Sequence, residues 1–433
     1  MKKTLLLTAA LGLAGASPLM AVDLYVTGST AFRANVYTAC SKLFDNGVPA
    51  SITYGDAAHG GDANNNSKTA SWCMTGTVSN NITALGQTPL TIHGLFTGSV
   101  QGIQTVEAGT KLLFSTPTSG VYVTNTPTIG FSDASGTSTP YPATGNFSEE
   151  NVCVQPFVMV KSVIGGAMTN VTNITWEQLR YGIAAGRVPL SSWSGKPADH
   201  SSYVYVIQRT KDSGTRRCEL AQEQFGYNAP CTVYLYDNVT NNIFYKPSAT
   251  AIVGSAGLNN VNLNWGSGYV GGGNIATELA YNNAANQAIS YLSMGDARTI
   301  TGVNWSQVIP FNGLYPTAAG AGISGNTGTN DFTPIAEGLY PCWGYEVLVY
   351  PNVDPSSINS DQNLTAAQLG NQSATGTILG VLDAQTLING GSPLVGSIEN
   401  EIELSKTAAN GATAIRLSDM VSSRQSVGGT ITP

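Results

Sequence analysis

Short apolar runs alternate with amphipathic stretches along most of this chain. The apolar runs predict buried strands at 23–27, 90–95, 128–131, 154–163, 204–207 and 343–351. The amphipathic stretches predict helices at about 31–44, 99–107, within 173–193 and ending at Gly186, from 213 onward, and at 271–291, 365–369 and 378–387. Strands that alternate with helices indicate an α/β fold with mostly parallel sheets flanked by helices.

Two of the predicted strands, near 156 and near 346, lie at the ends of a central block of sequence. If both cross between two lobes, residues 22–155 and 345–433 form lobe 1, and residues 156–344 form lobe 2. Ligands of open α/β sheets lie at the carboxyl ends of the strands, so the cleft between the lobes is the expected site. The segment 45–90, rich in Asn, Gly and Ser, is expected to be an irregular insertion.

Small and hydroxyl residues follow four of the predicted strands. GSTAF (28–32), FTGSVQG (96–102) and DSGT (212–215) would each open a helix, and GFSDAS (130–135) presents a carboxylate. A helix start offers free N–H groups and the positive end of the helix dipole, which attract an anion. Arg209, directly after a strand, can add a fork of donors. Each segment alone is also typical of an ordinary helix cap or turn, whereas the set predicts an oxyanion site.

Charged residues make up only 10% of the 433 residues. Residues 1–21 are expected to be a secretory signal peptide, because Lys2 and Lys3 precede a short apolar run and small residues lead to Ala21. Its removal would lower the formal charge from −7 to −9, and without a basic run nucleic acid is not an expected partner. No transmembrane segment is expected in the mature chain, so the location is expected to be periplasmic or secreted.

Six cysteines in an exported chain suggest three disulfides, and six cysteines allow fifteen connectivities. Closeness in sequence favours the first of the three pairs that we predict. They are Cys218–Cys231, Cys40–Cys73 and Cys153–Cys342. Pairing the last two would hold the crossover strands side by side. No metal site is expected, since only three His occur and no Cys-x-x-Cys is present.

Several motifs together carry a family resemblance that covers most of the mature chain. They are GSTAFRANVY (28–37), GLFTGSVQGIQ (94–104), GFSDAS (130–135), NITWEQLRYGIAAGRVPLSSW (173–193), VIQRTKDSGTRR (206–217) and GGGNIATELAYNNAANQAISYLSMGDA (271–297). With them the chain resembles the phosphate-binding substrate protein of bacterial ABC importers, a type 2 periplasmic binding protein. The resemblance implies two lobes joined by two crossover strands and a monomer that captures inorganic phosphate for a membrane ABC permease. It implies no catalysis and no cofactor.

The resemblance also implies roles for individual residues. The phosphate ligands that it implies are Thr30, Ala31, Phe32, Ser99, Asp133, Arg209, Ser213, Gly214 and Thr215. Asp133 would accept a hydrogen bond from the proton that phosphate retains near neutral pH and that sulfate lacks. The chain departs from the family where Ala31 replaces a threonine and where Val100 and Gln101 replace a double glycine. Lys211 replaces the acid expected two residues after the arginine, and Asp212 is the alternative.

Two other functions stay open. A surface or matrix protein of the same fold could bind another oxyanion, such as arsenate or sulfate, or could have lost transport. A secreted hydrolase could use Ser213 or Ser132 as its nucleophile, but it would need a nearby His and a G-x-S-x-G elbow. The sequence offers neither convincingly, so we expect a binding protein rather than an enzyme.

Overall fold

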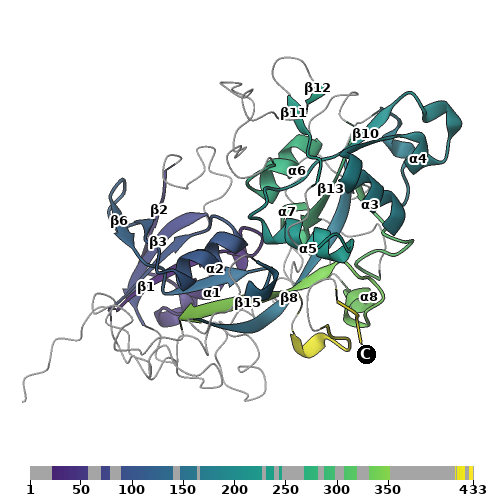
Figure 1. The fold of residues 1–433 in the computed structure, drawn as a ribbon. Helices are drawn as coiled ribbons and strands as arrows, with labels where there is room; N and C mark the ends of the chain where they lie inside the picture. Colours follow the sequence, from purple (N-terminus) through teal and green to yellow (C-terminus); the bar gives the residue numbers. More distant parts are fainter. Residues whose placement is uncertain are drawn as a thin grey trace, which may run out of the picture.

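A computed structural model of the chain shows strands and helices gathered on both sides of a pair of long strands (Figure 1). The residues that the structure describes are 22–56, 70–78, 89–139, 147–162, 166–226, 231–237, 243–245, 268–280, 287–297, 307–318, 331–351, 415, 417–424 and 429–432. The expected signal peptide and the helices expected at 365–369 and 378–387 lie outside these residues. Within the described part, no helix is long and apolar enough to cross a membrane.

The first group of elements precedes the long strands in sequence. Its members are β1 (Val22–Gly28), α1 (Arg33–Ser41), β2 (Ser51–Tyr54), β3 (Ser71–Thr77), β4 (Pro89–Leu95), α2 (Ser99–Glu107), β5 (Leu112–Ser115), β6 (Tyr122–Asn125) and β7 (Ile129–Ser132). Strands β4, β1 and β7 pair in parallel in that order, while β3 and β2 extend the sheet antiparallel beyond β4. The parallel strands place the residues that follow β1 and β7 at one edge of the sheet.

The second group lies between the two long strands in sequence. Its members are α3 (Trp176–Ala185), β9 (Arg187–Pro189), α4 (Ser191–Ser194), β10 (Tyr203–Val206), α5 (Gly214–Gln222), β11 (Leu235–Asp237), β12 (Ile243–Tyr245), α6 (Gly272–Ala280), β13 (Ala288–Ser293), α7 (Met294–Ala297), β14 (Val308–Ile309) and α8 (Thr333–Ala336). Strands β10 and β13 are parallel, and β13 runs antiparallel to the first long strand.

The two long strands, β8 (Phe147–Lys161) and β15 (Trp343–Pro351), connect the groups. They pair antiparallel along the whole of β15, with a register shift between Glu346 and Val347. Figure 1 shows them crossing between the side of β1, α1 and α2 and the side of β10, β13 and α5. The strand order β2-β3-β4-β1-β7-β15-β8-β13-β10-β9 makes one mixed sheet of both groups. This arrangement confirms the α/β class and the two crossover strands.

Buried side chains form two large hydrophobic clusters rather than one. The first surrounds Leu24, Phe32, Trp72 and Phe131, and the second surrounds Phe157, Trp193 and Trp343. Along β8 the membership changes between Cys153 and Val154. Two cores are what two lobes require, because each lobe must bury its own apolar surface. The residue boundaries at 155 and 345 stay a prediction.

Helix α3 shows how local sequence sets an element's limits. Thr175 and Gln178 form a capping box, in which each side chain hydrogen-bonds the backbone N–H of the other. The helix ends at Gly186, whose φ of 74° is the left-handed conformation that glycine adopts without strain. The end expected at Gly186 is therefore confirmed.

Two expectations for the elements were wrong. The segment 45–90 is not wholly irregular, because β2 and β3 pair in register there and β3 pairs with β4. The helix expected over 271–291 ends at Ala280, and β13 begins at Ala288. Every residue of β13 is buried, so its sequence lacks the alternation that would separate it from a helix.

All six cysteines are free thiols, so the three predicted disulfides are wrong. Cys40 packs in the first core with Trp72 and Met74. Cys73 lies between those two residues in β3, and alternation along a strand turns it to the opposite face of the sheet. Burial raises the pKa of both thiols. The two sulfur atoms therefore face away from each other.

The other two pairs fail for similar reasons. Cys153 is aligned with Glu346 in the register of β8 and β15, whereas the carbonyl of Cys342 accepts from the N–H of Phe157. That offset of four residues is about 13 Å along a strand, too far for a disulfide. Cys218 Sγ donates to the Asp133 carbonyl, 2.9 Å away. Cys231 Sγ lies 2.7 Å from Arg216 Nη2, so these two sulfurs have separate partners.

Candidate functional site

The start of α5 forms one side of the candidate site. Ser213 caps the helix, and its Oγ accepts from the N–H of Arg216 at 3.3 Å. The N–H of Arg217 donates to the carbonyl of Ser213. The N–H groups of Gly214 and Thr215 come before the first N–H that bonds within the helix, so a ligand could accept from them. The helix start predicted from DSGT is where the structure places it.

Glycine at position 214 lets the helix start approach a carboxylate. A Cβ atom there would collide with Asp133 Oδ1 and lie 2.7 Å from Ser99 Oγ. The backbone of α5 is thus pressed directly against the end of β7. No other residue fits at 214 without moving one of those groups.

Arg209 is the buried cation of the site and is only 3% exposed. Its Nη2 donates to Thr30 Oγ1 at 3.0 Å and to the carbonyl of Val270 at 2.7 Å. Its Nε and Nη1 have no hydrogen-bond partner among the described residues. Burial lowers the pKa of Arg209, and the charges of Asp296 and Asp133 oppose that shift. A buried guanidinium with unpaired donors is a place where an anion is strongly favoured.

Asp133 faces this cation from the end of β7 and is 1% exposed. Its Oδ1 accepts from the hydroxyl of Ser99, at the start of α2, and its Oδ2 accepts from Thr215 Oγ1 at 2.9 Å. Burial raises the pKa of Asp133, while the two hydroxyl bonds and the charge of Arg209 lower it. Each carboxylate oxygen retains a lone pair that could accept another donor.

The residues after β1 complete the site. Thr30 is 8% exposed and reaches Arg209, as described above. Ala31 is half-buried, and α1 begins two residues later than predicted, at Arg33. The ring of Phe32 packs against Phe131, with centroids 6.0 Å apart, so its side chain belongs to the core. The N–H of Phe32 already donates to Ser29 Oγ at 3.3 Å, which leaves it weakly available for a ligand.

Further contacts hold the two sides of the site together. The N–H of Val100, in α2, donates to the carbonyl of Asp212 at 3.3 Å. Arg217 Nη1 donates to the carbonyl of Ser138 at 2.9 Å, beyond β7. The structure therefore brings residues from the starts of α2 and α5 and from the ends of β1, β7 and β10 to one buried place.

Sequence reasoning missed two groups around Arg209. The charge that raises the pKa of Arg209 most is that of Asp296 rather than that of Asp212, and Lys211 is exposed. Asp296 is 4% exposed at the start of α7, and its Oδ2 accepts from Ser293 Oγ at 2.9 Å. The carbonyl of Val270 is the second group. Both lie in or beside the GGGNIATELAYNNAANQAISYLSMGDA motif, but only the fold brings them to Arg209.

Neither histidine of the described chain meets the needs of a serine hydrolase. His93 Nδ1 lies 2.7 Å from the Ser115 carbonyl, and His200 Nδ1 lies 3.3 Å from Ser191 Oγ. Ser213 Oγ serves as a helix cap, and Ser132 Oγ donates to the carbonyl of Ala134. Among the described residues, no group of His, Cys, Asp and Glu could hold a metal ion.

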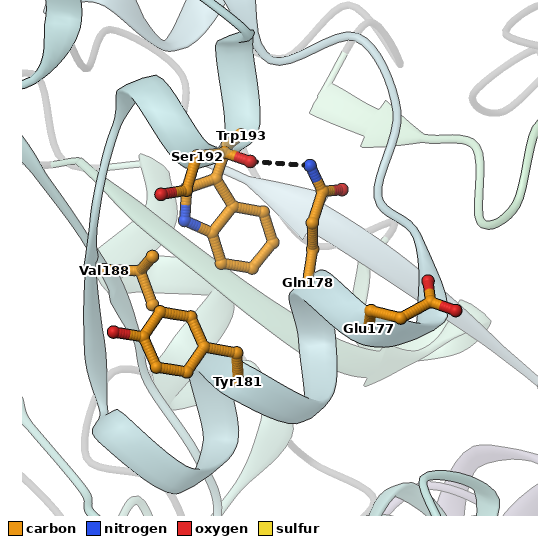
Figure 2. A pocket seen from close by; sticks show the side chains of 6 residues that line it. All are labelled: Glu177, Gln178, Tyr181, Val188, Ser192 and Trp193. Atoms are coloured by element: carbon orange, nitrogen blue, oxygen red, sulfur yellow. Dashed lines mark hydrogen bonds between the residues drawn. The ribbon is translucent and has the colours of Figure 1, made fainter.

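A separate pocket of about 180 Å³ lies beside α3 (Figure 2). Its lining is mostly apolar, with the faces of Tyr181, Val188 and Trp193, and Gln178 Nε2 closes one side by donating to the Ser192 carbonyl at 2.7 Å. None of the nine predicted site residues lines it. The pocket is therefore distinct from the candidate anion site.

Comparison with solved structures returns proteins of the class that the sequence motifs resemble. A putative phosphate ABC transporter substrate-binding protein with bound phosphate from Clostridium perfringens is 14% identical, with a TM-score of 0.44, over 91% of this chain and 99% of that one. An ABC-type phosphate transport receptor from Vibrio cholerae is 14% identical, with a TM-score of 0.36, over 78% and 88% of the two chains. PstS from Borrelia burgdorferi is 13% identical, with a TM-score of 0.31, over 76% and 87%. No family model and no curated protein sequence matches the chain.

Proposed function

We propose that this protein binds one phosphate ion at the place where α2, α5 and β7 meet. The observation that carries the proposal is the buried guanidinium of Arg209, whose Nε and Nη1 have no partner among the described residues. Burying a cation without its hydrogen bonds is costly, so the site is complete only when an anion supplies the acceptors. The helix start at Gly214 and Thr215 adds two N–H donors on the same side.

Asp133 favours phosphate over sulfate in this proposal. A carboxylate next to an anion is repulsive unless a proton lies between them. Phosphate near neutral pH carries at least one proton and can donate it to the free lone pair of Asp133, whereas sulfate has none. The hydrogen bonds from Ser99 and Thr215 and the charge of Arg209 lower the pKa of Asp133 against the effect of burial, which matters because a protonated Asp133 could donate to sulfate as well. Thr215 and Ser99 hold the carboxylate in place for this contact.

The wider role that we propose is that of a solute-binding protein outside the cytoplasm, which delivers phosphate to an ABC importer. Residues 22–155 with 345–433 and residues 156–344 would be the two lobes. The contacts of α5 with Asp133 and Ser138 would form when the lobes close on the ion. The crossover strands β8 and β15 would bend when the lobes open. No bond is made or broken in this cycle.

Isothermal titration of the chain from residue 22 onward with phosphate, arsenate and sulfate tests this proposal. We expect one site for phosphate, weaker binding of arsenate and at least about a hundredfold weaker binding of sulfate. Absence of heat with all three ions, confirmed by an unchanged melting temperature, would contradict it. Equal affinity for sulfate and phosphate would leave an oxyanion site but remove the role given to Asp133.

A further inference from the structure

A fully buried carboxyl, that of Glu346, lies in crossover strand β15 behind the anion site. Its exposed fraction is 0%, and it is aligned with Cys153 of β8. The register of β15 against β8 shifts immediately after Glu346. Neither carboxylate oxygen has a partner of hydrogen-bond geometry among the described residues. A charged group in such surroundings would be strongly destabilising.

Two neighbours connect Glu346 with the site. Val347 is aligned with Ser132 in the antiparallel pair of β15 and β7, so Glu346 and Asp133 are the next residues at that edge. The hydroxyl of Ser29 lies near enough to favour the ionised form of Glu346. The same hydroxyl accepts from the N–H of Phe32, at the start of α1. Glu346 thus borders both Asp133 and the residues that precede α1.

Among the described residues, no cation contributes to the pKa of Glu346. The end of β7 presents Asp133, β8 presents the thiol of Cys153, and α5 presents the thiol of Cys218. Arg217 and Arg424 act on the Cys218 thiol, but Asp133 is the charge that acts on Glu346.

The number of carboxylates near the site limits how strongly an anion can bind. Arg209 already faces two carboxylates, those of Asp133 and Asp296. A third carboxylate beside Asp133 would make the surroundings of a bound anion more negative and weaken its binding.

We infer that Glu346 is a positioning residue of the anion site, and that its carboxyl must hold a proton while the anion is bound. The inference rests on the proposed phosphate binding. In its neutral form the carboxyl leaves Asp133 free to interact with the ion and lies next to Ser29, which follows β1. When it ionises, it repels the ion. Burial and then the charge of Asp133 raise the pKa of Glu346, and Ser29 lowers it.

The test compares the parent protein with Glu346→Gln, which keeps the shape of the side chain and cannot ionise. Phosphate affinity is measured by titration calorimetry from pH 6 to pH 9.5, and the ratio of the two affinities removes the titration of phosphate itself. We expect equal affinity within about threefold at pH 6, and binding at least about tenfold tighter in the variant at the upper end. Glu337→Gln, the same chemical change at the end of α8, should follow the parent.

A second measurement distinguishes a proton effect from a structural one. In buffers of different ionisation enthalpy, phosphate binding at high pH should take up more protons in the parent than in Glu346→Gln. Ser29→Ala removes a group that favours the ionised form, so its loss of affinity should begin at higher pH than in the parent. This variant also serves if Glu346→Gln does not fold.

The results separate the two proposals. No phosphate binding by the parent at any pH would contradict the proposed function itself. Binding by the parent with a constant ratio to Glu346→Gln across the pH range, or with equal proton uptake, would overturn the inference and leave the function intact. The inference would also be overturned if phosphate affinity in Ser29→Ala began to fall at the same pH as in the parent or at a lower one.

Discussion

The hydroxyl of Thr215, in the first turn of α5, donates a 2.9 Å hydrogen bond to Oδ2 of Asp133, which follows β7. The two residues are 82 positions apart and lie in the two groups of elements that β8 and β15 connect. Beside this bond, Gly214 is in contact with the same carboxylate. One buried acid is therefore held by the start of a helix from the other side of the molecule. The predictions below test the groups around this contact.

Arg209→Ala should weaken phosphate binding about a hundredfold or more, because it removes the buried cation and its two unpaired donors. Titration calorimetry with inorganic phosphate measures the change. Arg187→Ala is the matched control, since that arginine is exposed and stacks on Tyr203 with its guanidinium 4.9 Å from the ring. Affinity retained by Arg209→Ala would remove this residue from the site.

Asp133→Asn should reduce the preference for phosphate over sulfate about tenfold or more. The amide cannot carry a negative charge, and its NH₂ can donate to a fully ionised oxyanion. Competition between the two ions, measured by calorimetric displacement, gives the ratio. If the variant discriminates as strongly as the parent, Asp133 does not select the ligand.

Gly214→Ala should abolish or severely weaken phosphate binding while the fold is retained. The new methyl group would collide with Asp133 Oδ1 and push the start of α5 away from the carboxylate. Gly273→Ala tests the same substitution in the first turn of α6, where the nearest atom to the new methyl would be Arg33 Nη2 at 4.0 Å. Circular dichroism should be unchanged for both, and only the first should lose affinity.

Stability should fall as the pH rises from about 5 to about 9, because two buried acids, one in α5 and one directly after it, keep their protons in the folded state. Burial, and for Glu223 also the charge of Glu219, raises the pKa of Glu219 to about 8 and that of Glu223 to about 9. Both pKa values lie above the ordinary 4.5, so the folded state holds more protons than the unfolded state in this window. The loss is at most about 1.4 kcal/mol per pH unit for each group.

Urea unfolding at several pH values measures that slope. Glu223→Gln should flatten it, whereas Glu337→Gln, at the exposed end of α8, should leave it unchanged. A slope that is equally steep without Glu223 would show that another group titrates.

All six cysteines should react with an alkylating reagent after unfolding without reductant. The structure gives each of them as a free thiol. Cys342 lies opposite Phe157 of β8, four residues away from Cys153 along that strand. Mass spectrometry of the alkylated chain counts the thiols. A chain that gains two, four or no labels instead of six would restore some of the disulfides predicted from the sequence.

Several features of the site could be predicted from short stretches of sequence. The cap at Ser213 and the capping box of Thr175 and Gln178 depend on residues three apart, so the sequence alone contains both partners. The strands before Thr30, Asp133 and Arg209 were visible as apolar runs. These local patterns were enough to predict strands and helices whose connecting residues carry the hydroxyl, amide and guanidinium groups that bind an oxyanion.

The tertiary structure decided which distant groups meet. Asp296 acts on Arg209 from 87 positions later, and Glu346 reaches the border of the site through the register of β15 with β7. The free state of the cysteines follows from the faces and registers of strands, which the spacing of Cys residues does not contain. Capping and periodicity are local, whereas charge balance and sulfur distances depend on which strands pair and in what register. Only the folded arrangement therefore decided which charged residues surround the anion site.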